Sequence, residues 1–158
     1  MAGRRRRIHA DTSVFGGVFD EEYAEASGTV FALVRTGRFN LVLSRVVENE
    51  IAGAPVEVSE LFGDMLRYAE VAMTSEAAVD LQRAYLEAGI VSERYALDAL
   101  HVALATVSGC SVIVSWNFRH IVHFRKVPMY NAVNIDQGYP IITICSPPEV
   151  IEYEEEEV

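Results

Sequence analysis

Short apolar runs alternate along this chain with longer segments of helical periodicity. This alternation is typical of an α/β domain, in which helices connect the strands of a mainly parallel sheet. Strands are expected at residues 8–10, 39–43, 71–73, 112–115 and 141–144, and helices at residues 21–36, 44–51, 58–68, 76–88 and from 92 or 93 to about 105. A turn is expected at Gly16 and Gly17. The length of 158 residues allows one such domain with a sizeable core and excludes two large ones.

The net charge of −10, from 13 Lys and Arg against 23 Asp and Glu, has the wrong sign for a protein that holds nucleic acid on a lysine-rich surface. A nucleic-acid function must then be catalytic and metal-assisted, or depend on local basic patches. Charge also divides the chain into a basic segment (1–7), a folded domain (8–146) and an acidic tail (147–158). We expect both ends to be solvated, and the Glu-rich end to be disordered.

The cysteines and most of the histidines suggest no further chemistry. Cys110 and Cys145 form neither a CxxC pair nor a disulfide framework, so we expect two reduced, packed thiols in a cytoplasmic protein. His120 and His123 lack the Cys or His/Glu signature of a zinc site and, like His9, are expected to be ordinary polar residues. The sequence has no apolar run of about 18 residues, so no membrane span is expected.

Asp98 lies in a segment, 96–105, that is apolar nearly all round the helix. An ionised carboxylate in such surroundings costs several kcal/mol unless something pairs with it. One candidate partner is His101, one turn later on the same helix. The other is a metal ion that Asp98 shares with further carboxylates, and the residues alone leave both open.

Two more polar side chains are expected at the carboxyl edge of the sheet. Asp11 follows the first strand and Asn117 follows the strand at 112–115, and open α/β sheets form their sites at this edge. Asp11 could instead cap the following turn with Thr12 and Ser13.

Glu48 and Glu50 are about 200° apart on their helix, so only one of them can face a shared site. Glu48 can pair with Arg45 at the surface, whereas the small and apolar neighbours of Glu50 favour an inward position. Glu50 is therefore the better candidate for a site residue.

Three carboxylates would be forced together if Asp11, Glu50 and Asp98 converge. Each pair at about 4 Å would repel by roughly 4 kcal/mol at an effective dielectric constant of 20. A divalent cation would relieve this repulsion, and all-oxygen ligands favour Mg²⁺ or Mn²⁺ over zinc. Such a site hydrolyses phosphodiester bonds.

At this point the sequence resembles a known family. The matching segments are Asp11-Thr12-Ser13-Val14, residues 44–51 with Glu50, residues 98–105 with Asp98, and Ser115-Trp116-Asn117-Phe118. In this order they resemble the PIN-domain ribonucleases and, within them, the VapC-like toxins of type II toxin–antitoxin systems. The resemblance spans about residues 8–145.

The resemblance implies a three-layer α/β/α sandwich in which Asp11, Glu50 and Asp98 bind Mg²⁺ or Mn²⁺ for the cleavage of RNA. The family commonly has a fourth acid where this chain has Asn117, which removes one negative charge from the site. Water or phosphate would be positioned by Asn117 or by hydroxyls, which could equally well cap a turn. These hydroxyls belong to Thr12, Ser13 and Ser115.

The resemblance also implies partners. Toxins of this family are inhibited by an antitoxin that inserts basic side chains into the acidic groove, and homodimers are expected. An alternative hypothesis is a protein of the same fold that binds RNA or protein without efficient catalysis, because Asn117 and the overall acidity are compatible with a weakened site.

Overall fold

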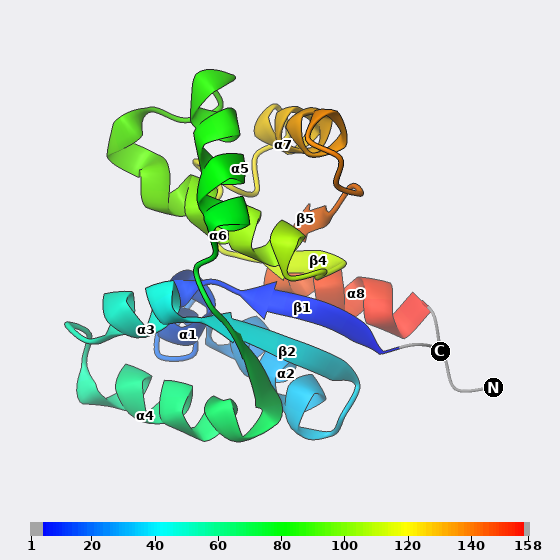
Figure 1. Ribbon diagram of the computed structural model, residues 1–158. Coiled ribbons are helices and arrows are strands. Elements are labelled where there is room, and N and C mark those ends of the chain that lie inside the picture. The colour runs from blue at the N-terminus through cyan, green and yellow to red at the C-terminus, as the bar shows by residue number, and fades with distance from the viewer. Residues whose placement is uncertain (1–4, 157–158) are drawn as a thin grey trace.

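Five parallel strands form the central sheet of the protein, which a computed structural model describes over residues 5–156. The strand order is β3-β2-β1-β4-β5, and every neighbouring pair is parallel. The strands are β1 (Arg6–Ala10), β2 (Phe39–Ser44), β3 (Ala69–Ala72), β4 (Val112–Val114) and β5 (Thr143–Cys145). A parallel sheet was predicted from the alternation of strands and helices, and Figure 1 confirms it.

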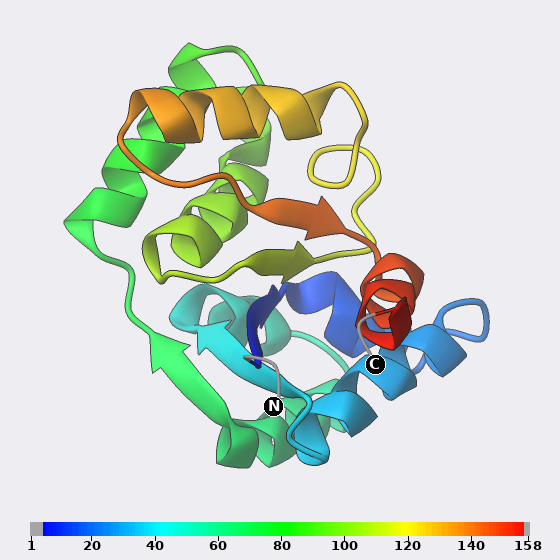
Figure 2. The ribbon, with the colours of Figure 1, turned by 90° about the vertical axis from the view of Figure 1, so that its right-hand side faces the viewer.

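Helices cover both faces of this sheet and complete an α/β/α sandwich (Figures 1 and 2). Those packed on one face are α1 (Thr12–Gly17), α2 (Ala24–Arg35), α3 (Arg45–Ile51), α4 (Val56–Met65) and α8 (Pro147–Glu156). Those on the other are α5 (Glu76–Glu87), α6 (Ala96–Val107) and α7 (Lys126–Asp136). Two short 3₁₀ helices, η1 (Leu66–Tyr68) and η2 (Glu93–Tyr95), precede β3 and α6.

The strands divide the core because successive side chains point to opposite faces. In β2, Leu41 and Leu43 pack in the cluster beneath α1–α4, and Val42 packs in the cluster beneath α5–α7. In β4, Ile113 faces α6 while its neighbours face the other side. Strands buried on both faces explain the continuous apolar runs in the sequence.

The helix signals of the sequence are largely confirmed. Ser44 caps α3 by accepting a hydrogen bond from the backbone N–H of Val47 at 3.3 Å, as its position predicts. The turn expected at Gly16 and Gly17 is instead the last part of α1. Helix α7 was not predicted, because only Tyr130 and Asn134 are fully buried on it and Pro128 interrupts its pattern.

The C-terminal segment corrects a prediction. Residues 147–156 form α8 rather than a disordered acidic tail, and α8 packs against α2 (Figure 2). Val150 is 1% exposed in the core, and Glu154 forms an ion pair with Arg38 at 2.7 Å. One apolar stripe and one basic partner are therefore enough to fold a segment whose composition is mostly acidic. Residues 157 and 158 lie outside the described part.

The basic segment at the N-terminus is likewise part of the domain where the structure describes it. Arg6 and Arg7 belong to β1, and Arg7 forms an ion pair with Glu70 of β3 at 2.6 Å. The guanidinium of Arg6 lies 4.0 Å from the ring centroid of Tyr153 on α8. Residues 1–4 lie outside the described residues. Within the described chain, no helix has the length and apolar character needed to cross a membrane.

Candidate active site

Asp11 lies directly after β1, at the carboxyl edge of the sheet. Its side chain is buried, and its N–H donates to the carbonyl of Val114 at 3.3 Å. Ser13 Oγ donates to Oδ1 at 2.5 Å and Ser115 Oγ donates to Oδ2 at 2.7 Å. Although Asp11 occupies the N-cap position of α1, its carboxylate caps no backbone N–H of that helix. The two hydroxyls fix the carboxylate at the junction of β1 and β4 instead.

The surroundings of Asp11 make its ionised form costly. Burial raises the pKa of Asp11, and the charge of His101 and the hydrogen bonds from Ser13 and Ser115 only partly oppose this. The nearby carboxylate of Glu50 raises the pKa further. Asp11 is therefore a buried acid whose nearby basic group is the imidazole of His101, and within residues 5–156 its carboxylate accepts no hydrogen bond from a lysine or arginine.

Glu50 pairs with His101. Nε2 of His101 lies 2.6 Å from Oε1 of Glu50, and Thr12 Oγ1 donates to the same oxygen at 3.1 Å. Burial raises the pKa of Glu50, but the hydrogen bond and charge of His101 outweigh it, so the net pKa is lowered. Burial lowers the pKa of His101, but the bond to Glu50 and the charges of Asp11 and Glu50 leave it raised. The pair therefore favours a carboxylate and an imidazolium.

His101 is the site residue that sequence reasoning placed wrongly. It was considered only as a partner for Asp98, whereas its direct partner is Glu50 on α3. The available signal was a second polar residue inside the apolar segment of α6, where His101 is almost fully buried. The sequence could not show that α3 rather than the first turn of α6 faces this imidazole.

Asp98 occupies the first turn of α6 and is only half-buried. Among the described residues its carboxylate makes no hydrogen bond, and its charge helps to raise the pKa of His101. The fully apolar environment expected for Asp98 is therefore wrong, because the start of α6 remains open to solvent. Asp98 belongs to the electrostatic surroundings of the pair formed by His101 and Glu50.

Asn117 lies in the loop after β4. Its Oδ1 accepts hydrogen bonds from the backbone N–H groups of Arg119 at 3.2 Å and His120 at 2.9 Å. The backbone N–H of Asn117 donates to Ser115 Oγ at 2.9 Å. The side-chain oxygen is thus occupied in shaping the loop, and a role for it at a metal remains a prediction.

Within residues 5–156, no three His, Cys, Asp or Glu side chains are grouped closely enough to hold a metal ion as arranged. The chemistry of the donors nevertheless suits a hard cation, because Asp11 and Glu50 offer carboxylate oxygens and the hydroxyl partners of Asp11 are neutral. Glu50 and Asp98 both retain exposed surface. Binding would need these two side chains to turn toward Asp11.

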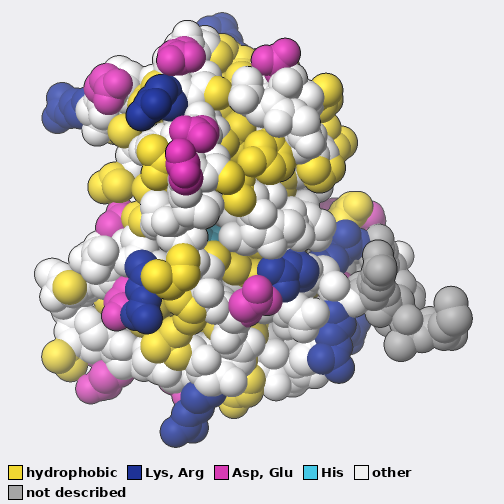
Figure 3. All heavy atoms as spheres, viewed as in Figure 1, with side chains coloured by type: hydrophobic (Ala, Val, Ile, Leu, Met, Phe, Trp, Pro, Cys, Tyr) yellow, Lys and Arg dark blue, Asp and Glu magenta, His cyan; other side chains and the backbone are white. Residues whose placement is uncertain are grey.

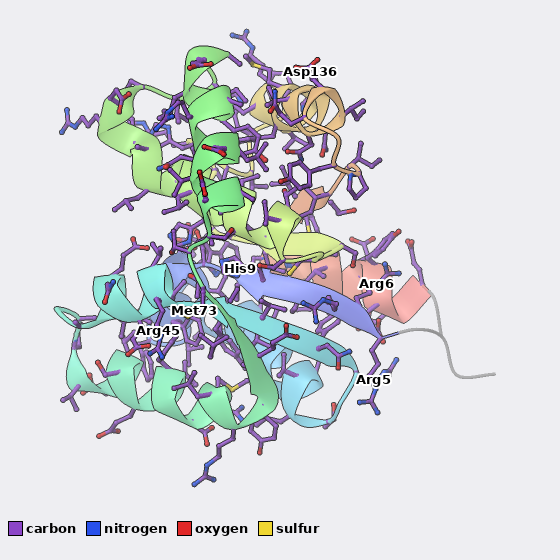
Figure 4. The ribbon with its side chains drawn as sticks, viewed as in Figure 1. Arg5, Arg6, His9, Arg45, Met73 and Asp136 are labelled. Carbon is purple, nitrogen blue, oxygen red and sulfur yellow. The ribbon has the colours of Figure 1, made fainter. Side chains whose placement is uncertain are left out.

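The remaining histidines and the cysteines have structural surroundings. His9, on the face of β1 toward α6 (Figure 4), donates from Nδ1 to the carbonyl of Val42 at 3.0 Å, and burial lowers its pKa to about 3. The ring of His120 stacks on Tyr95 at 3.9 Å. The two cysteines are free and buried, in agreement with the prediction.

The charged side chains on one face of the protein are of mixed sign. On the face shown in Figure 3, the Lys and Arg side chains lie interspersed with those of Asp and Glu. A continuous basic surface is absent there among the residues that the structure describes, as the net charge predicts.

Comparison with known proteins rests on solved structures. No family model matches the sequence, and no curated protein matches it significantly. The fold is similar to a chain of VapBC2 from Rickettsia felis, crystallised with a promoter DNA fragment, at a TM-score of 0.55 and 12% identity over 89% of this chain and 98% of that chain. It is equally similar to FitAcB from Neisseria gonorrhoeae, at a TM-score of 0.55 and 12% identity over 89% and 97%.

A third solved structure is the sarcin–ricin loop cleaving toxin VapC20 of Mycobacterium tuberculosis. It shares 15% identity over 72% of this chain and 92% of that chain, at a TM-score of 0.48. The first two likenesses confirm the three-layer fold that the resemblance to PIN-domain proteins implies.

Proposed function

We propose that this protein is a metal-dependent endoribonuclease, and that it acts as the toxin of a toxin–antitoxin pair. The observation that carries the proposal is the buried carboxylate of Asp11 at the carboxyl edge of the sheet, held by two hydroxyls and with the imidazole of His101 as its nearby basic group. Glu50 lies close enough to affect its pKa. The α/β/α fold supports the same reading.

Mg²⁺ or Mn²⁺ would be held by Asp11, Glu50 and Asp98. When bound, such a cation activates water and neutralises the charge that develops on the phosphodiester. The protein's own contribution begins with Ser13 and Ser115, whose hydroxyls hold the Asp11 carboxylate in one orientation. A carboxylate fixed in this way needs little reorganisation during the reaction.

His101 and Thr12 position the second carboxylate. Both contact Oε1 of Glu50, so one oxygen is engaged by them and the other remains available for a cation or for water. The loop that carries Asn117 is shaped by its side chain, and Asn117 therefore acts by placing the loop after β4 near the substrate.

The test is cleavage of RNA in the presence of Mg²⁺ or Mn²⁺. We expect activity in the wild type, and loss of about 100-fold or more in Asp11→Asn and Asp98→Asn, the order of effect of removing a charge that stabilises a transition state. Asp64→Asn is the control, because Asp64 pairs with Arg35 on the surface of α4. An inactive wild type under broad metal conditions, or equal activity in Asp11→Asn, would contradict the proposal.

A second candidate function is binding without efficient catalysis. It is favoured by Asn117, which replaces an acid and whose side-chain oxygen is engaged in the loop. Calorimetry with Mn²⁺ separates the two functions, because a binding module should take up no metal. Raised affinity in Asn117→Asp would show a metal site that is present but weakened.

Partners follow from the same proposal. An antitoxin of this type would be a small protein with an Arg- or Lys-bearing segment that reaches the carboxylates of Asp11 and Glu50. The VapBC2 structure is itself of a complex on promoter DNA. A homodimer and a cytoplasmic location are also part of the proposal, and sedimentation of the purified protein tests the first of these.

A further inference from the structure

Three aromatic side chains contact one another next to the candidate site. Tyr23, in the loop before α2, lies against Trp116 with ring centroids 4.1 Å apart and an interplanar angle of 32°. Phe118 contacts the edge of Trp116 at 6.2 Å. We call Tyr23, Trp116 and Phe118 the aromatic platform. Phe118 is 48% exposed, so one side of its ring is open to a ligand.

The platform is held firmly from below. The indole N–H of Trp116 donates to Ser27 Oγ at 2.8 Å. Gly17 leaves the room for it, because a Cβ at this position would lie 2.8 Å from Nε1 of Trp116 and 2.5 Å from Ser27 Oγ. The central ring, Trp116, is therefore fixed in place, and Phe118 packs against this fixed ring.

The same residues tie the platform to Asp11. Ser13 Oγ accepts a hydrogen bond from the backbone N–H of Trp116 at 2.9 Å and itself donates to Asp11. Ser115, the other partner of Asp11, is three residues before Phe118. Three residues span at most about 11 Å of chain. A base next to a phosphodiester bound at Asp11 can therefore reach the platform.

The segment that carries the platform is basic in an acidic protein. Residues 116–126 contain three cations and no Asp or Glu, although the whole chain has a net charge of −10. Arg119, directly after Phe118, is exposed, and so is Arg125. Lys126 is bound to the carbonyl of Ile90 at 2.6 Å. Arg119 is thus placed to contact the phosphate next to a nucleobase that stacks on Phe118.

We infer that the aromatic platform is the subsite for an unpaired nucleobase, with Phe118 stacking on the base and Arg119 contacting the adjoining phosphate. The inference rests on the proposed function for its substrate class. Aromatic faces beside basic side chains are how proteins hold single-stranded RNA, and a base inside a duplex cannot reach such a surface.

The chain offers a direct probe, because Trp116 is its only tryptophan. A short single-stranded 2′-O-methyl oligonucleotide, which resists cleavage, is titrated in EDTA at low salt while the tryptophan fluorescence is followed. We expect quenching in the wild type, about tenfold weaker binding in Phe118→Ala, and near wild-type binding in Phe118→Tyr, which keeps the ring. Arg119→Gln should weaken the salt dependence of binding.

Tyr68→Ala is the matched control. Tyr68 is 45% exposed and precedes β3, so it lies at the amino edge of the sheet, opposite Asp11. Thermal unfolding confirms that each variant is folded. The inference is overturned if Phe118→Ala binds the oligonucleotide as tightly as the wild type, if the wild type does not bind it, or if a blunt duplex binds equally well. If Phe118→Ala keeps RNA binding but loses binding of a peptide, the platform serves a protein partner instead.

The outcome is separable from that of the proposed function. If the wild type cleaves RNA in a metal-dependent way and Phe118→Ala has the same KM, the proposed nuclease function is supported and the proposed role of the aromatic platform is contradicted. If Phe118→Ala binds the oligonucleotide more weakly but the wild type does not cleave RNA with any metal, the role of the aromatic platform is supported and the proposed nuclease function is contradicted.

Discussion

Nε2 of His101 lies 2.6 Å from Oε1 of Glu50, and this contact joins buried helix α6 to α3 at the carboxyl edge of the sheet. The imidazole is 3% exposed in its side chain, so its charge depends on the carboxylates around it. Asp11 and Glu50 both raise the pKa of His101 against the effect of burial. These carboxylates therefore favour the protonated form of His101.

The first prediction is a pH-dependent contribution of this pair to stability. The pKa of His101 is raised above 6.5, so its contribution is complete below pH 6.5 and lost as pH rises through the raised value. The pKa of Glu50 is lowered below 4.5, so its contribution is complete above pH 4.5 and lost as pH falls through the lowered value. The pair is most stabilising between pH 4.5 and 6.5.

Urea unfolding of Glu50→Gln measures this contribution. We expect a loss of about 1 kcal/mol near pH 5.5, small because Glu50 is partly exposed, and a smaller loss near pH 8.5. Glu48→Gln is the control, since Glu48 forms a surface pair with Arg45 on the same helix. A penalty for Glu50→Gln that is the same at both pH values would show that His101 is not the protonated partner.

The second prediction concerns His9, whose pKa burial lowers to about 3. The folded protein keeps this imidazole neutral, whereas the unfolded chain protonates it near pH 6.5. Below pH 6.5 the unfolded state binds more protons, so stability should fall as pH drops, by up to about 1.4 kcal/mol per pH unit from this group.

His9→Asn retains a donor for the carbonyl of Val42 and removes the titrating ring. Its unfolding free energy should depend less steeply on pH between about 6.5 and 4 than that of the wild type. Val42→Ala serves as a control for lost packing, because it is destabilised without losing a titrating group. Parallel pH profiles for His9→Asn and the wild type would show that His9 takes up its proton in the folded state.

The third prediction uses two adjacent glycines of α1. In Gly17→Ala the new methyl group would meet Ser27 Oγ and the indole of Trp116, so we expect a loss of about 1–3 kcal/mol. In Gly16→Ala nothing lies within 4 Å of the new carbon, and helix propensity should add about 0.5–1 kcal/mol. Tryptophan fluorescence during urea unfolding measures both variants. Equal stability of the two would mean that Trp116 moves freely.

The sequence was sufficient for a mainly parallel sheet and for the position of Asp11 at the end of the first strand, because strand ends can be located from β-branched runs and turns. It was insufficient for the partner of His101, since residues 50 and 101 belong to α3 and α6, which are far apart in the sequence and come together only in the fold. Asp98 was misjudged because periodicity does not show which end of an apolar helix stays open to solvent. Only the folded chain shows the platform around Trp116, whose rings come from separate loops.

The fourth prediction concerns α8, where composition was misleading. Five glutamates at residues 152 and 154–157 suggest a solvated segment, yet the buried face of α8 depends on Val150 and on Glu154, whose side chain is only 13% exposed beside Arg38. Val150→Ala should cost about 2 kcal/mol, from lost apolar burial and the cavity left behind. Glu155→Ala, on the exposed side of the same helix, should change stability by less than about 0.5 kcal/mol. Urea unfolding measures both, and an unchanged stability in Val150→Ala would mean that α8 is detached from the domain in solution.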